Sequence, residues 1–244
     1  MSEEKPPDAG LDESALDVAG LDDAALDDVT PDDAALDNVT PDDAALDDAA
    51  LDDIVRRFRR RSERFAATVA GVAETAWGNQ SPCAEWTARD VVGHVVDMHQ
   101  AMLTPVGRAL SPAPTVDEDP LAAVHAARAD VEAVLVDPTV ARTVVGTPMG
   151  QTTVARHVDE VVSADLVLHG WDLARATFQD DTIDPAEVER MWPTAVAMPA
   201  EMRTPDAFGP GIVVFGPRVA VPDDAPLQDR LLGELGRDPD FTPR

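Results

Sequence analysis

An aspartate and a histidine that stand four residues apart, Asp165 and His169, are the first candidates for chemistry in this sequence. The surrounding stretch, residues 152–180, contains no proline or glycine before Gly170, and its apolar residues mostly recur at helical spacing. Side chains at this spacing lie on one helix face, roughly 6 Å apart. A carboxylate and an imidazole on adjacent turns can bind one metal ion, although a solvated or core pair has the same spacing.

A second stretch, residues 81–103, supplies a third candidate ligand. Thr87 and the acid three residues later have the form of a capping box, so we expect a helix to begin there. Its apolar residues form one stripe, which His94 interrupts with an imidazole directed toward the same interior. If two helices of a bundle face each other, His94, Asp165 and His169 can surround one ion. Three protein ligands and one open position are typical of a catalytic zinc site.

Other polar residues near these positions are candidates for supporting roles. Asp172, three residues after His169, and Asp97, three after His94, could orient the imidazoles, although solvated or capping roles are as common. Arg175 on the same predicted helix could reach a substrate carboxylate, whereas a surface ion pair is its commoner role.

Some neighbouring residues are expected to take no part in metal binding. His99 lies five residues from His94 and should face elsewhere, at the surface. Cys83 lies 11 residues before His94, about 16 Å away at the helical rise, which is too far to bind the same ion. We expect its thiol to act as a small buried hydrophobe, although a helix N-terminus can lower a thiol pKa. Trp86 and Trp171 are expected in the core or in a cavity wall.

Three separated blocks of the sequence resemble a known family. They are PCAEWTARDVVGHVVDMH, LVLHGWDLARAT and FGPRVAVPDDAPLQDRLLGELGRDP, and the resemblance extends over residues 54–240. The family comprises actinobacterial proteins with the mycothiol-dependent maleylpyruvate isomerase metal-binding domain, in the DinB-like superfamily. The resemblance implies a four-helix bundle that binds a divalent metal, usually taken as zinc. The residues that match the family ligands are His94, Asp165 and His169.

The resemblance also implies a chemistry. The isomerase has Glu where this chain has Asp165, and the shorter side chain brings metal affinity and metal choice, zinc or nickel, into question. In the family the metal binds the sulfur of mycothiol, and a divalent cation deprotonates a coordinating thiol. The thiolate then adds to an electrophilic substrate, which gives isomerisation or conjugation. The alternatives are a metal-dependent hydrolase and a non-catalytic metal-binding or stress-related interaction protein.

Composition limits the class of protein and its partners. The 244 residues are 44% hydrophobic, which is enough for one core of up to about 200 residues. The formal net charge is −28, so bulk neutralisation of nucleic-acid phosphates is excluded. A single cysteine, no signal-peptide pattern and no long apolar run predict a soluble cytoplasmic protein without membrane contact. We expect small-molecule partners and a monomer or homodimer.

Three segments are predicted along the chain. Residues 1–51 repeat an acidic unit of about ten residues whose leucines form no continuous apolar stripe, so we predict a disordered tail that could bind a protein partner. Residues 52–205 are predicted as the all-α DinB-like bundle. Residues 206–244 are predicted as an extension that packs on the bundle, with a strand at 212–215 and a helix from Pro226 to Leu235.

Within the bundle the apolar periodicity predicts several helices, and the β-branched stretch 142–145 predicts an extended lead or a small hairpin. The arginine-rich face near residue 56 is expected to be solvated. The predicted helices are 52–76, 88–110, 120–136, 152–180 and 185–198.

Overall fold

The computed structural model describes residues 46–147, 150–203 and 216–243. The predicted disordered tail lies almost entirely outside these ranges, and the predicted strand at 212–215 lies wholly outside them. The elements are α1 (Asp48–Ala70), α2 (Ala88–Leu103), α3 (Pro120–Leu135), α4 (Pro138–Ala141), β1 (Val144–Thr147), β2 (Gly150–Thr153), α5 (Val154–Glu160), α6 (Val162–Ala176), α7 (Pro185–Ala197) and α8 (Leu227–Glu234).

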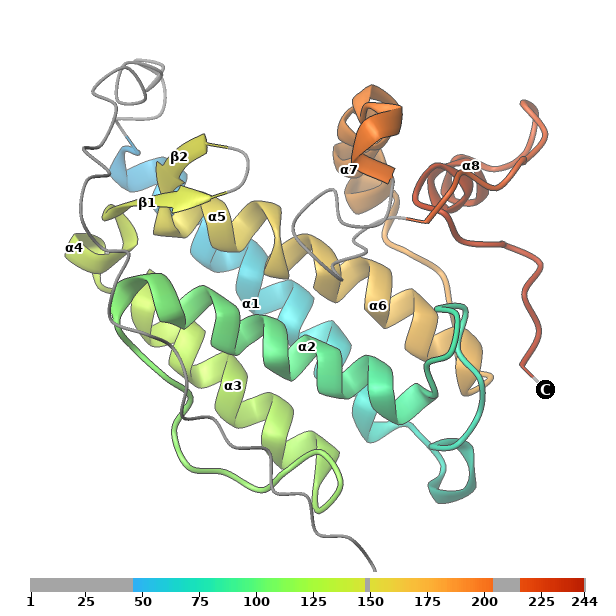
Figure 1. Cartoon of the computed structure of the whole chain (residues 1–244), viewed down its shortest axis with the longest axis horizontal. Helices are drawn as coiled ribbons and strands as arrows, with labels where there is room; N and C mark the ends of the chain where they lie inside the picture. Colours follow the sequence, from blue (N-terminus) through green and yellow to red (C-terminus); the bar gives the residue numbers. More distant parts are fainter. Residues whose placement is uncertain (1–45, 148–149, 204–215, 244) are drawn as a thin grey trace, which may run out of the picture. The chain divides into compact units, whose positions relative to one another are not determined.

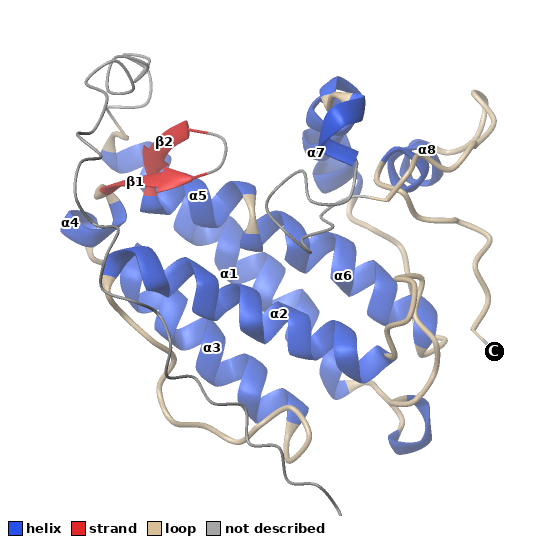
Figure 2. Cartoon of the chain, viewed as in Figure 1, coloured by secondary structure: helices blue, strands red, loops and turns tan. Residues whose placement is uncertain are grey.

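The helices α1, α2, α3 and α6 form the bundle. Both α1 and α2 pack against α3 and α6, as Figure 1 shows, and this confirms the predicted all-α bundle with a small C-terminal extension. In the described ranges the only sheet is the antiparallel hairpin of β1 and β2, drawn red in Figure 2, which pairs Val144 with Thr153. Within the same ranges, no helix is both long and apolar enough to cross a membrane.

Local signals explain where the helices begin and end. The capping box predicted at Thr87 is present and starts α2. The first helix begins at Asp48, earlier than predicted, because the Asp47 side chain accepts a hydrogen bond from the Ala50 amide. The second helix ends at Leu103 and not at 110, because a single 3-10 turn that contains Pro105 follows it, and Gly107, with positive φ, then ends that turn.

The predicted central helix is two helices. Between α5 and α6, Val161 has φ −103° and ψ −85°, which interrupts the helix. The first residues of the predicted stretch belong instead to β2, and Thr153 caps α5 by accepting a hydrogen bond from the Arg156 amide. Apolar spacing continues through the interruption, so periodicity did not reveal it. Pro193 lies inside α7 without ending it.

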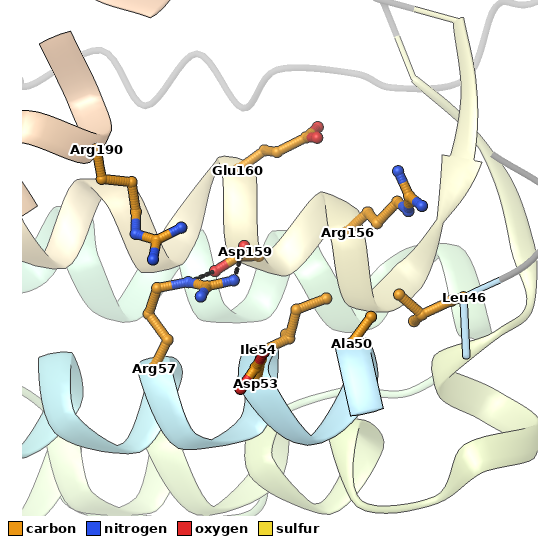
Figure 3. A pocket seen from close by; sticks show the side chains of 9 residues that line it. All are labelled: Leu46, Ala50, Asp53, Ile54, Arg57, Arg156, Asp159, Glu160 and Arg190. Atoms are coloured by element: carbon orange, nitrogen blue, oxygen red, sulfur yellow. Dashed lines mark hydrogen bonds and ion pairs between the residues drawn. The ribbon is translucent and has the colours of Figure 1, made fainter. Parts of the chain in front are cut away.

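Two arginines of α1 bind the residues on either side of this break. Arg57 donates two hydrogen bonds to Asp159 of α5, at 2.7 and 2.5 Å, across a cleft between the two helices (Figure 3). Arg61 donates to Ser163 Oγ of α6 at 2.9 Å and is only 5% exposed. The expected solvated basic face is therefore right for residues such as Arg56, and wrong for Arg57 and Arg61.

The core has two parts, one on each side of α6. The first fills the bundle between α1, α2, α3 and α6. The second joins the other face of α6 to α7 and α8, through Leu168 and Trp171 against Leu231 and Leu232. A helix that is apolar on both sides is a buried helix, so α6 is fixed in position from two directions.

We predict that Asp159→Asn lowers the free energy of unfolding by about 1–3 kcal/mol, since an amide cannot accept both hydrogen bonds from a charged guanidinium. The control is Asp53→Asn, which removes the exposed pair with Arg56 and should cost less than about 0.5 kcal/mol. Urea denaturation measures both. Equal effects would show that the contact of Arg57 with Asp159 adds no more stability than the exposed ion pair of Arg56 with Asp53.

Candidate metal centre

Three side chains from two helices meet between α2 and α6. His94 Nε2 lies 3.8 Å from Asp165 Oδ2, and the His94 and His169 rings lie edge to face with centroids 4.8 Å apart. One ligand atom from each of the three residues lies within 4.8 Å of the others. The structure therefore brings together the residues that the sequence singled out.

The donor atoms fit a divalent ion. Zinc bonds to nitrogen and oxygen are about 2.0–2.2 Å long, so tetrahedral ligand atoms lie about 3.3 Å apart. The spacing of 3.8 Å between His94 and Asp165 exceeds this by about 0.5 Å, and the limit of 4.8 Å for the whole set exceeds it by about 1.5 Å. Rotation of the side chains can supply closures of this size. His94 and Asp165 have side chains 29% and 26% exposed, so the set is open toward solvent on one side. Two imidazoles and one carboxylate with one open side match a catalytic zinc set.

A buried carboxylate holds His169 in place. Asp172 is completely buried, and its Oδ2 lies 3.0 Å from Nδ1 of His169. Because a carboxylate only accepts, this hydrogen bond assigns the imidazole proton to Nδ1 and leaves the Nε2 lone pair for a metal. This is the geometry that the sequence prediction for Asp172 requires.

Asp172 is itself held by Arg237, which follows α8. Burial alone would raise the pKa of Asp172, but the Arg237 guanidinium and the His169 hydrogen bond outweigh burial and lower the pKa to about 2. Arg237 Nη2 lies 3.0 Å from Asp172 Oδ2. Sequence reasoning missed Arg237 because 65 residues separate the pair. The only available signal was its place in the third block of the family resemblance.

Cys83 lies much nearer to the centre than predicted. Its Sγ is 3.2 Å from Asp172 Oδ2, and Cys83, His169 and Asp172 offer ligand atoms within 4.8 Å of one another. The prediction treated the chain from Cys83 to α2 as a straight helix, whereas residues 80–87 form a loop closed by a bridge between Gln80 and Thr87. Burial and the Asp172 charge raise the pKa of the Cys83 thiol, which is opposite in direction to the lowering that a helix N-terminus can cause.

Asp97 does not support His94. It is exposed, and among the described residues it makes no hydrogen bond or ion pair with His94. A three-residue step rotates a helix by about 300°, which is about 60° short of a full turn, so spacing alone leaves both outcomes open. Cys83 and Arg237 contact Asp172, whereas Asp97 is exposed. Of the two roles that the sequence left open, Asp97 takes the solvated one, although its spacing from His94 is the same as that of Asp172 from His169.

Arg175 forms the surface ion pair that was the commoner expectation. Its Nη1 lies 2.8 Å from Asp181 Oδ2, its Nη2 donates to the Pro239 carbonyl, and its guanidinium lies 5.7 Å from the Trp171 ring. These contacts engage the side chain, so the structure gives no support to a substrate-binding role. The Trp86 ring packs against His94, with centroids 4.8 Å apart, and forms a wall of the site.

His99 is buried, and the expectation that it lies at the surface is wrong. It is 1% exposed, its ring lies 6.0 Å from that of Phe58, and its Nδ1 donates to the Val95 carbonyl at 2.7 Å. Five residues rotate a helix by about 140° relative to His94, which turns His99 toward α1. Burial lowers the pKa of His99.

Comparison with known proteins identifies the family. A match to the mycothiol maleylpyruvate isomerase N-terminal domain covers residues 58–174 and contains His94, Asp165, His169 and Asp172. The chain belongs to this family. Two uncharacterized proteins, from two strains of Mycobacterium tuberculosis, are each 33% identical over 183 residues, which cover 73% of this chain and 94% of the relative. No solved structure matches significantly.

Family membership confirms the resemblance drawn from the three sequence blocks. The family is a metal-binding one, and the described residues contain a candidate ligand set inside the matched region. Arg237 lies beyond the matched region, in the C-terminal extension.

We predict that Asp172→Asn weakens zinc binding by about 10–100-fold, the range typical of losing a carboxylate that orients a ligating histidine. Asp97→Asn is the matched control, because Asp97 stands at the same spacing from His94 but is exposed. Competition with a chromophoric chelator measures both affinities. Equal affinities in the two variants would contradict the assigned role of Asp172.

A second prediction concerns pH. Because burial lowers the pKa of His99, the unfolded chain takes up the proton more readily than the folded one. The stability associated with neutral His99 is therefore complete above about pH 6.5 and is lost as pH falls below it. His157, whose pKa is also lowered by burial, contributes in the same direction.

His99→Gln should flatten the slope of unfolding free energy against pH between about 5 and 7, whereas replacement of the exposed His125 should leave it unchanged. Urea denaturation at several pH values measures the slope. An unchanged slope in His99→Gln would contradict the prediction.

Proposed function

We propose that this protein binds a divalent cation, zinc in the first instance, through His94, Asp165 and His169. We further propose that it uses the ion to present a mycothiol thiolate to an electrophilic substrate, as a thiol-dependent transferase or isomerase. The observation that supports this most is the convergence of two imidazoles and one carboxylate with one solvent-facing side. Membership of the mycothiol maleylpyruvate isomerase family indicates which thiol the ion would bind.

The charge of the ligand set favours a thiolate. Two neutral imidazoles and one carboxylate carry one negative charge, so they leave an excess positive charge on a divalent ion for an anionic fourth ligand. A divalent cation bound here would lower the pKa of a thiol at its open position and make thiolate available at neutral pH. Such a site requires no protein nucleophile.

Residues next to the ligand set orient His169, shield the imidazoles and leave the substrate thiol as the nucleophile. Asp172 fixes the His169 ring through Nδ1, so that Nε2 faces the ligand set. Trp86 packs across both imidazoles and shields one side of them from water. Cys83 lies next to Asp172, and its raised pKa keeps it a thiol, so it does not compete with the substrate thiol as a nucleophile. A single free cysteine suits the reducing cytoplasm, where we place this reaction.

The test combines metal analysis with turnover. His94→Ala and His169→Ala should each weaken zinc binding by more than the roughly 10–100-fold typical of losing a supporting residue. Asp165→Glu, which restores the longer acid of the isomerase, should retain binding. Replacement of the exposed His125 by Ala is the control.

Zinc-loaded protein should conjugate mycothiol to an electrophile such as monochlorobimane, or isomerise maleylpyruvate, and should lose this activity with a chelator. Unchanged zinc binding in both alanine variants would refute the proposed centre. Zinc binding without thiol turnover would indicate a non-catalytic metal-binding protein. Hydrolysis that needs no thiol would indicate a metal-dependent hydrolase.

A further inference from the structure

His169 lies between two possible sets of metal ligands. On one side are His94 and Asp165, and on the other are Cys83 and Asp172. A thiol, an imidazole and a carboxylate within 4.8 Å of one another are also a set that zinc or a softer cation accepts.

The two sets compete for one imidazole. A neutral imidazole has a single lone pair, so it offers either Nε2 or Nδ1 to a metal, and not both. Nδ1 of His169 lies 3.0 Å from Asp172 Oδ2, on the side of Cys83. A cation bound there would take the Nδ1 lone pair and move the proton to Nε2. The set with His94 and Asp165 would then lose its third ligand.

Arg237 stands where that cation would bind. Its Nη2 lies 3.2 Å from Cys83 Sγ and 3.0 Å from Asp172 Oδ2, and its Nε lies 3.2 Å from Asp172 Oδ1. The residue is 7% exposed. A guanidinium is always charged, so a divalent ion would meet a fixed positive charge at hydrogen-bonding distance from two of its three ligands.

Backbone contacts of the C-terminal segment fix the direction of the Arg237 side chain. The Arg237 amide donates to the Leu232 carbonyl at 2.8 Å, and its Nη1 donates to the Leu235 carbonyl at 3.2 Å. The preceding Gly236 has φ 78°, and a Cβ there would lie 2.9 Å from the Gly216 backbone. Only glycine suits both the conformation and the close approach, so the turn holds Arg237 in one direction.

We propose that Arg237 is a positioning residue that commits His169 to the set with His94 and Asp165. It holds Asp172 as the acceptor for the Nδ1 proton, and it excludes cations from Cys83, Asp172 and Nδ1. The inference rests on the proposed metal centre and extends it to the C-terminal extension.

The test is titration of the full chain with Cd²⁺, because cadmium bound to a thiolate gives a charge-transfer band in the ultraviolet. Wild-type protein should bind Cd²⁺ without this band. Arg237→Met, which removes the charge, should show the band and should bind Zn²⁺ about 10–100-fold more weakly through the His94 set. The double variant with Cys83→Ser should lose the band, which assigns it to the only cysteine in the chain.

Arg237→Lys keeps the positive charge but cannot make all three contacts with Asp172 and Cys83. It should exclude Cd²⁺ from the thiol and still bind Zn²⁺ more weakly than wild type. A thiolate band in wild-type protein with one equivalent of Cd²⁺ overturns the proposal even if Arg237→Met does not fold.

The two proposals fail in different ways. If wild-type protein binds one Zn²⁺ that His94→Ala abolishes, while Arg237→Met shows no band and unchanged affinity, then the role of Arg237 is wrong and the metal centre stands. If His94→Ala changes nothing and Arg237→Met gains the band, then the metal centre is wrong and cation exclusion by Arg237 stands.

Discussion

Asp172 is a carboxylate without any exposed surface, and a buried charge persists only where its surroundings neutralise and hydrogen-bond it. Its partners come from three segments: His169 one turn back on α6, Cys83 in the loop before α2, and Arg237 after α8. Each segment must reach α6 for Asp172 to be satisfied. One buried charge therefore links the candidate metal centre to the folding of the loop and of the C-terminal extension.

The position of α6 follows from contacts on all sides. The bundle core covers one face, and the apolar residues of α7 and α8 cover the other. Arg61 donates a hydrogen bond to Ser163 in the first turn of α6. Arg57 donates to Asp159 of α5, on the other side of the helix break. A helix fixed in this way presents ligands at defined positions, which a metal site requires because bond lengths tolerate only small errors. Figure 1 shows α6 between the other bundle helices and the helices α7 and α8.

The family match and the structure divide the site between two regions. Residues 58–174 contain the three candidate ligands and Asp172, whereas Arg237 lies outside the match. The extension contributes a charge to the centre as well as apolar packing against α6. The orientation of His169 therefore depends on the C-terminal extension, which lies outside the matched domain. The cleft beside Arg57 carries charges of both signs and is a separate feature between α1 and α5.

The sequence by itself determined what is local: the apolar stripes, the cap at Thr87, and the placing of Asp165 and His169 on one helix face. These features follow from backbone geometry over a few residues, so pattern reveals them. Asp172 and Asp97 stand at the same spacing from a histidine, and only the tertiary structure decided which of them supports a ligand. Asp172 contacts Arg237 in the interior, whereas Asp97 is exposed to solvent. That outcome depends on segments distant in sequence, whose contacts no local spacing encodes.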